Sequence, residues 1–481
     1  MWARAEAAGL ALAMTACAVG PDFVRPDAPK VDGYVRGSAE GTATANGQAQ
    51  RFNPGGRLDP DWWRLLGSEP LDALVAEVLT RNATLEAAQA TSRQSEDSLR
   101  AGYGVFWPSI GYDATAARER FNPASFGQAV PAQSFNLFTL SASVSYVLDV
   151  WGGDRRQVEA LAAQRDQQRF NALATYLMLA SNAANTAIAR SAYLEQIAAT
   201  EDLVARQKEQ VDIARAQARA GIAPYANVLS LVSQRDATLA TIPPLRQKID
   251  QAEHLLAALS GHTPGDWSAP DIPLAGLKLP ADVPLSLPSE LVRQRPDVLA
   301  AEAQLHQSNA LVGVATAALL PRLSLTPSLG LTAGSFSNQT AANDFVWNLG
   351  AGIAGPLFQG GTLWYQRRAA IDAKAAAIAN YRQTVLSAFQ QVADSLRGLQ
   401  HDAEDLAAQT EAVESAKQAL DLVQANYDAG LANYLQVLTA DEQWLQARLG
   451  YVQAVAQRLQ DTVALYVALG GGWWNAPKPP A

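Results

Sequence analysis

The side chains that most often perform chemistry in proteins are scarce in this sequence of 481 residues. Cys17 is the single cysteine, so the chain can form neither an internal disulfide nor a zinc or iron–sulfur site held by several thiolates. The four histidines lack the paired spacing typical of metal ligands; they are His254, His262, His306 and His401. We therefore expect no metal and no catalytic residue.

One glycine pattern has the spacing of a nucleotide-binding motif. Residues 350–355 satisfy G-x-G-x-x-G. In a dinucleotide site this pattern follows a strand and opens a helix, but here Pro356 comes next, followed by Gly360 and Gly361. Glycines late in a candidate strand are better explained by a bend of the chain. The sequence also contains no P-loop and no G-x-S-x-G elbow, so it does not indicate an enzyme.

The first sixteen residues have the features of an export signal. An apolar run over residues 7–14 follows Arg4 and ends at Thr15 and Ala16, directly before Cys17. The run is too short to cross a bilayer as a helix, and no longer apolar run follows. Residues 14–17 match the pattern in which bacterial lipoproteins acquire acyl chains on cysteine; a stray cysteine in a leader is the alternative. We expect a signal peptide at 1–16 and a covalent lipid on Cys17 as the only non-protein group.

The charge balance argues against a nucleic-acid partner. The chain has 37 Lys and Arg against 46 Asp and Glu, a formal net charge of −9. A protein that holds phosphates would need a basic balance or a basic stripe. Only 17% of the residues are charged, and much of the 48% hydrophobic share is alanine. This composition favours long helices over a disordered chain or a bundle of membrane helices.

The sequence contains one unit of about 210 residues twice. The segments around Gly221 and Gly430 lie 209 positions apart and share several residue types in register, and Pro108 corresponds to Pro321 at an offset of 213. Each unit has the same predicted order of a helix, two strands, a very long helix, a turn and a return helix. The predicted elements of the first unit are a helix at 71–101, strands at 109–120 and 135–147, and a long helix at 155–220. Those of the second are a helix at 297–320, strands at 322–333 and 345–354, and a long helix at 362–429.

The two long helices are the clearest signal in the sequence. Residues 155–220 contain neither glycine nor proline and would extend about 100 Å as a helix. Because no globular core is that deep, such a helix must lie along partner helices as in a coiled coil. Gly221 and Gly430 follow the helix ends, where a left-handed C-cap lets the chain turn back. We expect both glycines at the tips of helical hairpins.

The number of strands predicts an oligomer. Four amphipathic strands per chain are too few for a closed single-chain barrel, which needs at least about eight. An open sheet edge in hydrocarbon is not viable because its backbone polar groups lack partners. Two copies would give eight strands and three would give twelve, and the larger barrel leaves room for a lumen. A small soluble four-stranded sheet is the alternative.

Several segments together resemble the TolC-like outer-membrane efflux family, in the lipoprotein branch that serves resistance-nodulation-division pumps. The resemblance covers nearly the whole chain, and besides the two tips it is carried by residues 17–23 (CAVGPDF), 62–68 (WWRLLGS), 146–152 (YVLDVWG), 293–298 (RQRPDV) and 355–358 (GPLF).

The resemblance implies an α+β membrane protein that assembles as a homotrimer. It implies a 12-stranded outer-membrane β-barrel, four strands per chain, continuous with a 12-helix periplasmic α-barrel, and two structural repeats per chain. It also implies a periplasmic adaptor protein, an inner-membrane pump and outer-membrane lipid as partners. The implied segments after the signal are a tether and belt at 17–69, a first repeat at 70–269, a linker and belt at 270–288, a second repeat at 289–469 and a tail at 470–481.

The resemblance also implies where functional residues lie. The periplasmic mouth would be narrowed just past the second tip, where Gln436 and Thr439 occupy the positions at which relatives carry acidic residues. The nearest acidic residues here are Asp441 and Glu442, for which a solvated helix face is the alternative. The adaptor would contact the hairpin tips, although simple turn geometry explains these residues as well; they are Gly221, Ala223, Tyr225, Gly430, Ala432 and Tyr434.

Aromatic residues complete the predictions. Trp62, Trp63, Trp473 and Trp474 are expected to pack in the belt. Phe121, Phe126, Phe336, Phe345 and Trp347, beside the strands, are candidates for the membrane interface.

The resulting hypothesis is an exit duct of a tripartite efflux system, which passes small molecules through a gated pore without bond chemistry. Two alternatives are a duct for type I secretion or metal export and a lipid-anchored periplasmic scaffold without a pore.

Overall fold

The fold is described from a computed structural model that covers residues 18–37, 40–122, 127, 130–335 and 344–476. The chain divides into two compact units. Unit 1 comprises residues up to 26, residues 92–168 and residues 301–381, and unit 2 comprises residues 27–91, 169–300 and from 382 onward. The boundaries fall within long helices. Cys17, Phe126 and Phe336 lie outside the described residues.

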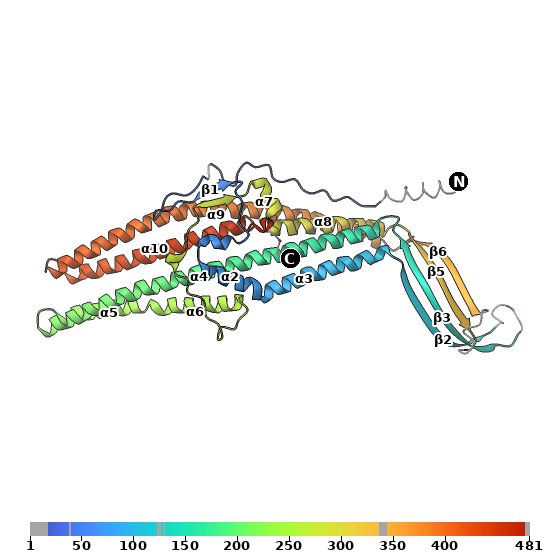
Figure 1. The fold of residues 1–481 in the computed structure, drawn as a ribbon, viewed down its shortest axis with the longest axis horizontal. Helices are drawn as coiled ribbons and strands as arrows, with labels where there is room; N and C mark the ends of the chain where they lie inside the picture. The colour runs from blue at the N-terminus through green and yellow to red at the C-terminus, as the bar shows by residue number, and fades with distance from the viewer. Residues whose placement is uncertain (1–17, 38–39, 123–126, 128–129, 336–343, 477–481) are drawn as a thin grey trace. The chain divides into compact units, whose positions relative to one another are not determined.

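Unit 1 contains an antiparallel four-stranded sheet (Figure 1). Its strands are β2 (Ser109–Phe121), β3 (Gln133–Leu148), β5 (Arg322–Ala333) and β6 (Phe345–Ala354), in the order β2-β3-β5-β6. The structure places β5 and β6 at their predicted bounds and extends β2 and β3 by one to two residues at their ends. All four predicted strands are therefore present in the sheet.

The sheet is joined to the ends of four helices in unit 1. These helices are α3 (Ala83–Gly102), α4 (Gly153–Arg219), α8 (Pro296–Ala317) and α9 (Thr362–Asp428). Gly102 of α3 lies so close to Leu161 of α4 that an added Cβ would come within 2.5 Å of the Leu161 side chain. Between α9 and α8, Nε of Arg367 donates to Oγ1 of Thr316 at 3.1 Å. The short 3-10 turn Tyr103–Phe106 connects α3 to β2.

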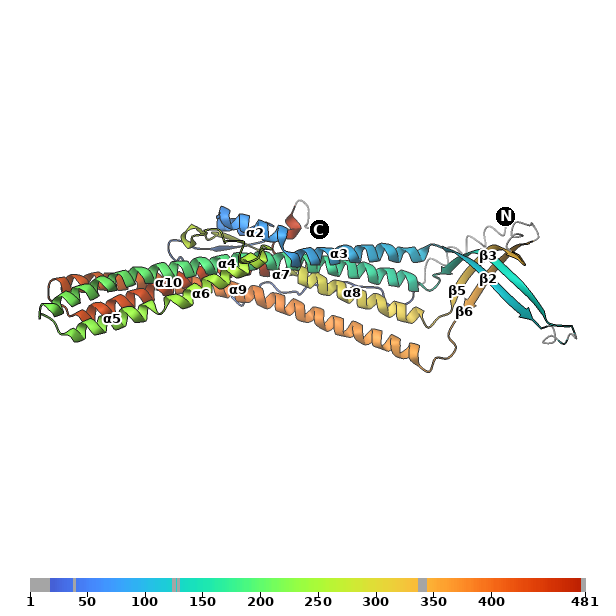
Figure 2. The same ribbon diagram turned by 90° about the horizontal axis from the view of Figure 1, so that it is seen from below.

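Unit 2 contains two helical hairpins (Figures 1 and 2). In the first, α4 turns at Gly221 and returns as α5 (Tyr225–Leu239) and α6 (Ile242–Leu259); in the second, α9 turns at Gly430 and returns as α10 (Tyr434–Ala468). Both glycines have left-handed backbones, with φ of +74° and +76°. Ile222 N–H bonds the carbonyl of Gln217, and Leu431 N–H bonds that of Asn426. Each glycine thus lies at the turn between the two antiparallel arms of a helical hairpin.

The remainder of unit 2 forms a belt of short elements. Strands β1 (Arg51–Pro54) and β4 (Asp282–Leu285) pair in parallel. The belt also contains the 3-10 turns Trp62–Leu66, Leu274–Gly276 and Trp473–Asn475 and the helices α2 (Glu69–Arg81) and α7 (Pro288–Gln294). Trp62 and Trp63 are buried, as predicted, and Trp62 stacks at an angle against Tyr466 of α10. Nε1 of Trp473 donates to the carbonyl of Gln294 at 2.7 Å.

Three predicted helices differ in the structure. The predicted helix at 71–101 is broken at Asn82, whose Oδ1 accepts the N–H groups of Thr84 and Leu85 and so caps a new helix. The first return helix is also broken, because Pro243 and Pro244 cannot donate backbone hydrogen bonds and occupy the first turn of α6. The predicted helix at 297–320 ends at Ala317.

Candidate functional site

The sheet of unit 1 has two faces of opposite character, which its register defines. One face presents mainly apolar side chains, as in the cross-strand row Tyr112, Ala142, Leu329 and Trp347. The opposite face presents mainly small and polar side chains, as in the row Gly111, Ser143, Ser328 and Asn348. Its apolar exceptions are Phe121, Phe135, Leu137, Val147 and Val346. On the apolar face, Tyr112 is 87% exposed and Trp347 is 72% exposed.

A soluble protein rarely exposes an apolar surface of this kind, which marks contact with a membrane or a partner. Both outer strands also have a free edge: among the described residues, β2 pairs with β3 alone and β6 with β5 alone. The sheet therefore has one face suited to contact with lipid, one face suited to contact with water, and two edges at which further strands can pair.

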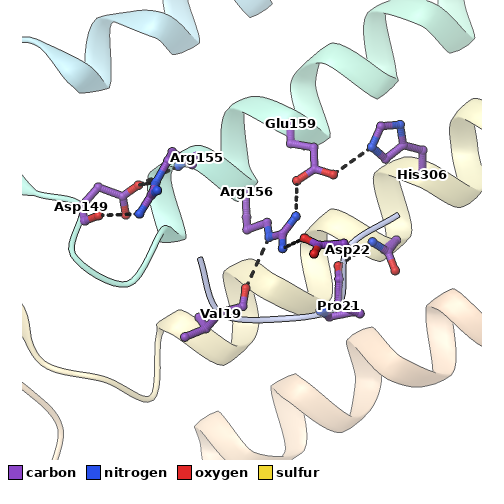
Figure 3. Close-up of polar contacts among 9 residues, drawn as sticks. Val19, Pro21, Asp22, Asp149, Arg155, Arg156, Glu159 and His306 are labelled. Carbon is purple, nitrogen blue, oxygen red and sulfur yellow. Dashed lines mark hydrogen bonds and ion pairs between the residues drawn. The ribbon is translucent and has the colours of Figure 1, made fainter. Parts of the chain in front are cut away.

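A second candidate site lies where the N-terminal segment meets the helices of unit 1 (Figure 3). Val19 N–H bonds the carbonyl of Trp151 at 2.9 Å, and Nε of Arg156 donates to the Val19 carbonyl at 3.3 Å. The same guanidinium, whose side chain is 7% exposed, contacts Asp22 at 2.6 Å and Glu159 at 2.7 Å. Burial would lower the pKa of Arg156, but its hydrogen bonds to these two carboxylates outweigh burial and raise it.

Two further contacts extend this network across three segments. Glu159 of α4 lies 2.8 Å from Nε2 of His306 on α8 (Figure 3). The ring of Phe23 stacks on the His306 ring with centroids 4.2 Å apart. Asp149 has a separate role, because its carboxylate accepts the backbone N–H groups of Asp154 and Arg155 at the start of α4. The N-terminal segment is thus fixed to α4 and α8, while Asp149 fixes the turn before α4.

Glycines make room for this segment. Gly20, with φ of +97°, lies against Gly313 of α8, where an added Cβ would approach the Gly313 Cα to 2.4 Å. Gly152 lies against Ala18, where an added Cβ would come within 2.6 Å of the Ala18 Cα. Cys17, the predicted lipid attachment residue, lies outside the described residues. Ala18, which follows it, is held against Gly152, four positions after the end of β3.

The segment past the second tip contains the candidate gate residues. Asp441 is 2% exposed, and its Oδ2 accepts a hydrogen bond from Nε2 of Gln210 on α4 at 3.2 Å. The hydroxyl of Tyr434 donates to Oε1 of the same amide at 2.9 Å. Burial raises the pKa of Asp441, although the Gln210 hydrogen bond and the Arg206 guanidinium lower it.

The other three gate candidates lie on an exposed face of α10. Gln436, Thr439 and Glu442 are exposed, and their spacing of three residues places them on one helix face. The Gln436 side chain also accepts the N–H of Asn433 in a capping box that begins α10. The structure therefore separates the four candidates into one buried residue and one exposed row.

Residues one turn further along strengthen the contact between α10 and α4. Two guanidinium groups contact the Trp444 ring, with that of Arg206 at 4.7 Å and that of Arg448 at 5.4 Å from the ring centroid. Arg448 also approaches Asp202 of α4 at 3.5 Å. These partners were not identified from the sequence, because more than 200 positions separate the two helices.

The hairpin tips also expose apolar side chains that are not among the predicted contact residues. Ile222 is 77% exposed and Leu431 is 81% exposed, each directly after its tip glycine. Of the predicted contact residues, Tyr225 is 65% exposed, whereas Tyr434 is partly buried by its contacts with Gln210 and Tyr427. Ala223 and Ala432 are partly buried, and both tip glycines have open space around them.

Within the described part of the chain, no three or more His, Cys, Asp or Glu side chains are grouped so that they could hold a metal ion. Among the same residues, no helix combines the length and apolar character needed to cross a bilayer.

The two-faced sheet, continuous with long helical hairpins, defines a channel protein. The chain belongs to the outer membrane efflux protein family, whose model matches residues 74–262 and 287–471. It is therefore an outer-membrane channel of efflux systems that extends into the periplasm, and it is not an enzyme. Membership in this family excludes the alternative hypothesis of a periplasmic scaffold without a pore.

Individual relatives support this assignment. The chain is 30% identical to the pyoverdine export outer membrane protein OpmQ of Pseudomonas aeruginosa over 431 residues, covering 88% of this chain and 90% of the relative. It is 29% identical to outer membrane protein OprJ of the same species, covering 96% and 95%. The solved structure of the outer-membrane channel OprN matches with a TM-score of 0.87 at 28% identity, covering 95% of this chain and 100% of the other.

Proposed function

We propose that three copies of this chain form the exit duct of a tripartite efflux system, together with a periplasmic adaptor and an inner-membrane pump. The observation that carries the proposal is the sheet with one apolar face, one polar face and two free edges. Free edges in hydrocarbon leave backbone N–H and C=O groups without partners, so β2 of one copy pairs with β6 of the next. Three copies give twelve strands, whose interior is wide enough for a solvated lumen.

The polar face then lines the water-filled lumen, and the apolar face meets lipid. Serine, threonine and glycine are the most frequent residues of the polar face, so the lumen offers hydrogen bonds without a shape that selects one solute. The cargo is therefore chosen by the pump that delivers it. OpmQ is named for pyoverdine export; for this chain we propose small molecules as the cargo class.

The gate lies where α10 begins. Gln436, Thr439 and Glu442 form the exposed row that narrows the periplasmic mouth, once from each of the three copies. Asp441 acts differently: buried against Gln210, it holds the second hairpin to α4 and so keeps the mouth closed. Opening breaks this link as the hairpin that carries Gly430 moves outward.

The hairpin tips are the adaptor-binding surface. Ile222 and Leu431 project from Gly221 and Gly430, with Ala223, Tyr225, Ala432 and Tyr434 beside them. Exposed apolar side chains next to fixed turns suit a partner that buries them.

Cys17 carries the lipid anchor of this duct. The support is geometric: Ala18 and Val19 lie against Gly152 and Trp151, just after the end of β3, where this strand would leave the membrane. An acyl chain on the preceding residue would enter the adjacent leaflet without strain on the chain.

The test is a planar-bilayer recording of the purified protein combined with its oligomer mass in detergent. We expect a trimer that conducts ions. A monodisperse monomer in lipid, or a trimer that passes no ions, would contradict the proposal.

A further inference from the structure

Two arginines lie on the apolar face of the sheet. The register of β2 places Arg118 opposite Asn136 and Arg120 opposite Ser134, on the same face as Ile110 and Tyr112. Both arginines are exposed. The acidic residues of the four strands are Asp113 and Glu119, and both lie on the polar face. Neither arginine therefore has a carboxylate on its own face of the described strands.

The position of the two arginines along β2 can be estimated from strand geometry. Ser109 begins β2 next to the helices, so Phe121 at its other end is remote from them along the strand. The ten steps along the strand from Ile110 to Arg120 extend about 33 Å. With a tilt of about 40°, this distance rises about 25 Å, which is the height of the apolar band of an outer-membrane barrel. Arg118 and Arg120 consequently lie at the outer boundary of the lipid.

This position decides what the arginines contact. A guanidinium stays charged at any physiological pH and is strongly disfavoured at the bilayer midplane but tolerated near the interface. Residues two apart on one strand face are about 7 Å apart, so the two guanidinium groups can donate hydrogen bonds to neighbouring phosphate oxygens. Below them, Ala116, Leu140 and Tyr112 continue the apolar face. The surface thus matches a molecule with an anionic head and acyl chains.

We propose that Arg118 and Arg120 form a binding site for the phosphorylated headgroup of an outer-leaflet lipid, whose acyl chains lie along the apolar face. The inference rests on the proposed function, because it requires this face in the membrane. Each copy of the chain contributes one such site at the free strand β2, beside the junction with the next copy. The bound lipid therefore also covers the seam between subunits.

The experiment uses the purified full-length protein in a neutral detergent, with lipid A as the probe and native mass spectrometry as the readout. The variant Arg118→Gln/Arg120→Gln removes both charges while keeping hydrogen-bonding side chains. The control Arg93→Gln/Arg100→Gln makes the same charge change on exposed residues of α3. We expect wild type and control to bind lipid A equally and the sheet variant to lose at least about tenfold in affinity, since each charged contact contributes substantially.

Two further binding measurements identify the part of the lipid that is bound. Lipid A without its phosphates should bind as weakly to wild type as lipid A binds to the sheet variant, and inorganic phosphate should not displace lipid A at equal concentration. Undiminished binding to the sheet variant, equal binding of the dephosphorylated lipid, or displacement by inorganic phosphate would each overturn the proposal. Conductance of the same samples separates the two hypotheses: a conducting variant that still binds lipid A refutes only this site, whereas a non-conducting wild type refutes the duct.

Discussion

The side chain of Gln210 on α4 donates from Nε2 to the buried carboxylate of Asp441 on α10 at 3.2 Å. Through its Oε1, the same amide accepts the hydroxyl of Tyr434 at 2.9 Å. One amide thus satisfies two polar groups of the opposite hairpin, and Val211, Val228 and Leu438 pack beside it in a cluster that joins α4, α5 and α10. An apolar cluster of this kind does not discriminate between closely related packings, whereas a satisfied polar network does.

The first prediction concerns this link. Gln210→Leu leaves the Asp441 carboxylate buried without its donor and removes two hydrogen bonds of about 1 kcal/mol each. We expect the closed hairpin to be destabilised and the fraction of time in a conducting state to rise about tenfold or more in planar-bilayer recordings. Gln217→Leu, two turns along the same helix, is the matched control and should behave as wild type. Unchanged recordings in Gln210→Leu would show that the Gln210–Asp441 link does not hold the closed state.

The second prediction concerns the hairpin tips. Ile222→Asp and Leu431→Asp place charges on two side chains that are 77% and 81% exposed, so the fold should tolerate them. Binding to the adaptor should weaken at least about tenfold, because a buried charge without a partner is strongly unfavourable at an interface. Surface plasmon resonance with the cognate adaptor measures this, and single-channel conductance should stay at the wild-type level. Full adaptor affinity in both variants would exclude the tips as the docking surface.

Local sequence patterns predicted the elements whose signals lie within a few residues. The strands at 322–333 and 345–354 matched because alternation and flanking turns define them. Gly221 and Gly430 were located because a left-handed cap needs glycine. The break at Asn82 had a local signal, an asparagine able to cap, but the surrounding helical pattern outweighed it.

Contacts between distant segments had no such signal. Strands β1 and β4 pair although about 230 positions separate them, and neither is long enough to show a period. The same holds for Gln210 with Asp441 and for Arg156 with Asp22. Sequence patterns give the face of a helix but not which remote side chain meets it, so candidates such as Asp441 were predicted and their partners on remote helices were missed.

The third prediction concerns Asp402 of α9. The pKa of Asp402 is raised to about 7, and burial is the largest cause. A hydrogen bond to the Asp461 carboxylate of α10 and the negative charges of Asp461 and Asp405 also raise this pKa, whereas the Arg458 guanidinium lowers it. The folded protein therefore holds a proton that the unfolded chain loses near pH 4. Since the folded state binds more protons in this window, stability should fall as pH rises from about 4 to about 7 and level off above it.

Asp402→Asn tests this relation. The amide can still donate to Asp461 but cannot ionise, so the variant should lose this part of the pH dependence and unfold at a higher temperature than wild type at pH 8. Asp394→Asn, on an exposed position of the same helix that does not contribute to the pKa of Asp402, is the control and should retain the wild-type slope. Thermal unfolding followed by circular dichroism at pH 5 and pH 8 provides the comparison. Parallel pH profiles for wild type and Asp402→Asn would show that this carboxyl group does not hold the proton.

The last prediction concerns the N-terminal segment. Arg156→Met removes the contacts with the Val19 carbonyl and the Asp22 carboxylate, while the methionine chain keeps most of the apolar packing against Gly313. Hydrogen bonds to charged groups contribute about 1.5–3 kcal/mol each, so amide exchange of residues 18–26 should accelerate about tenfold or more. Hydrogen-exchange mass spectrometry resolves this segment from the helices. The neighbouring Arg155→Met is the matched control, because Arg155 pairs with Asp149 and its variant should leave residues 18–26 protected. Equal protection in both variants would mean that packing against the glycines, and not the arginine, fixes the segment that follows Cys17.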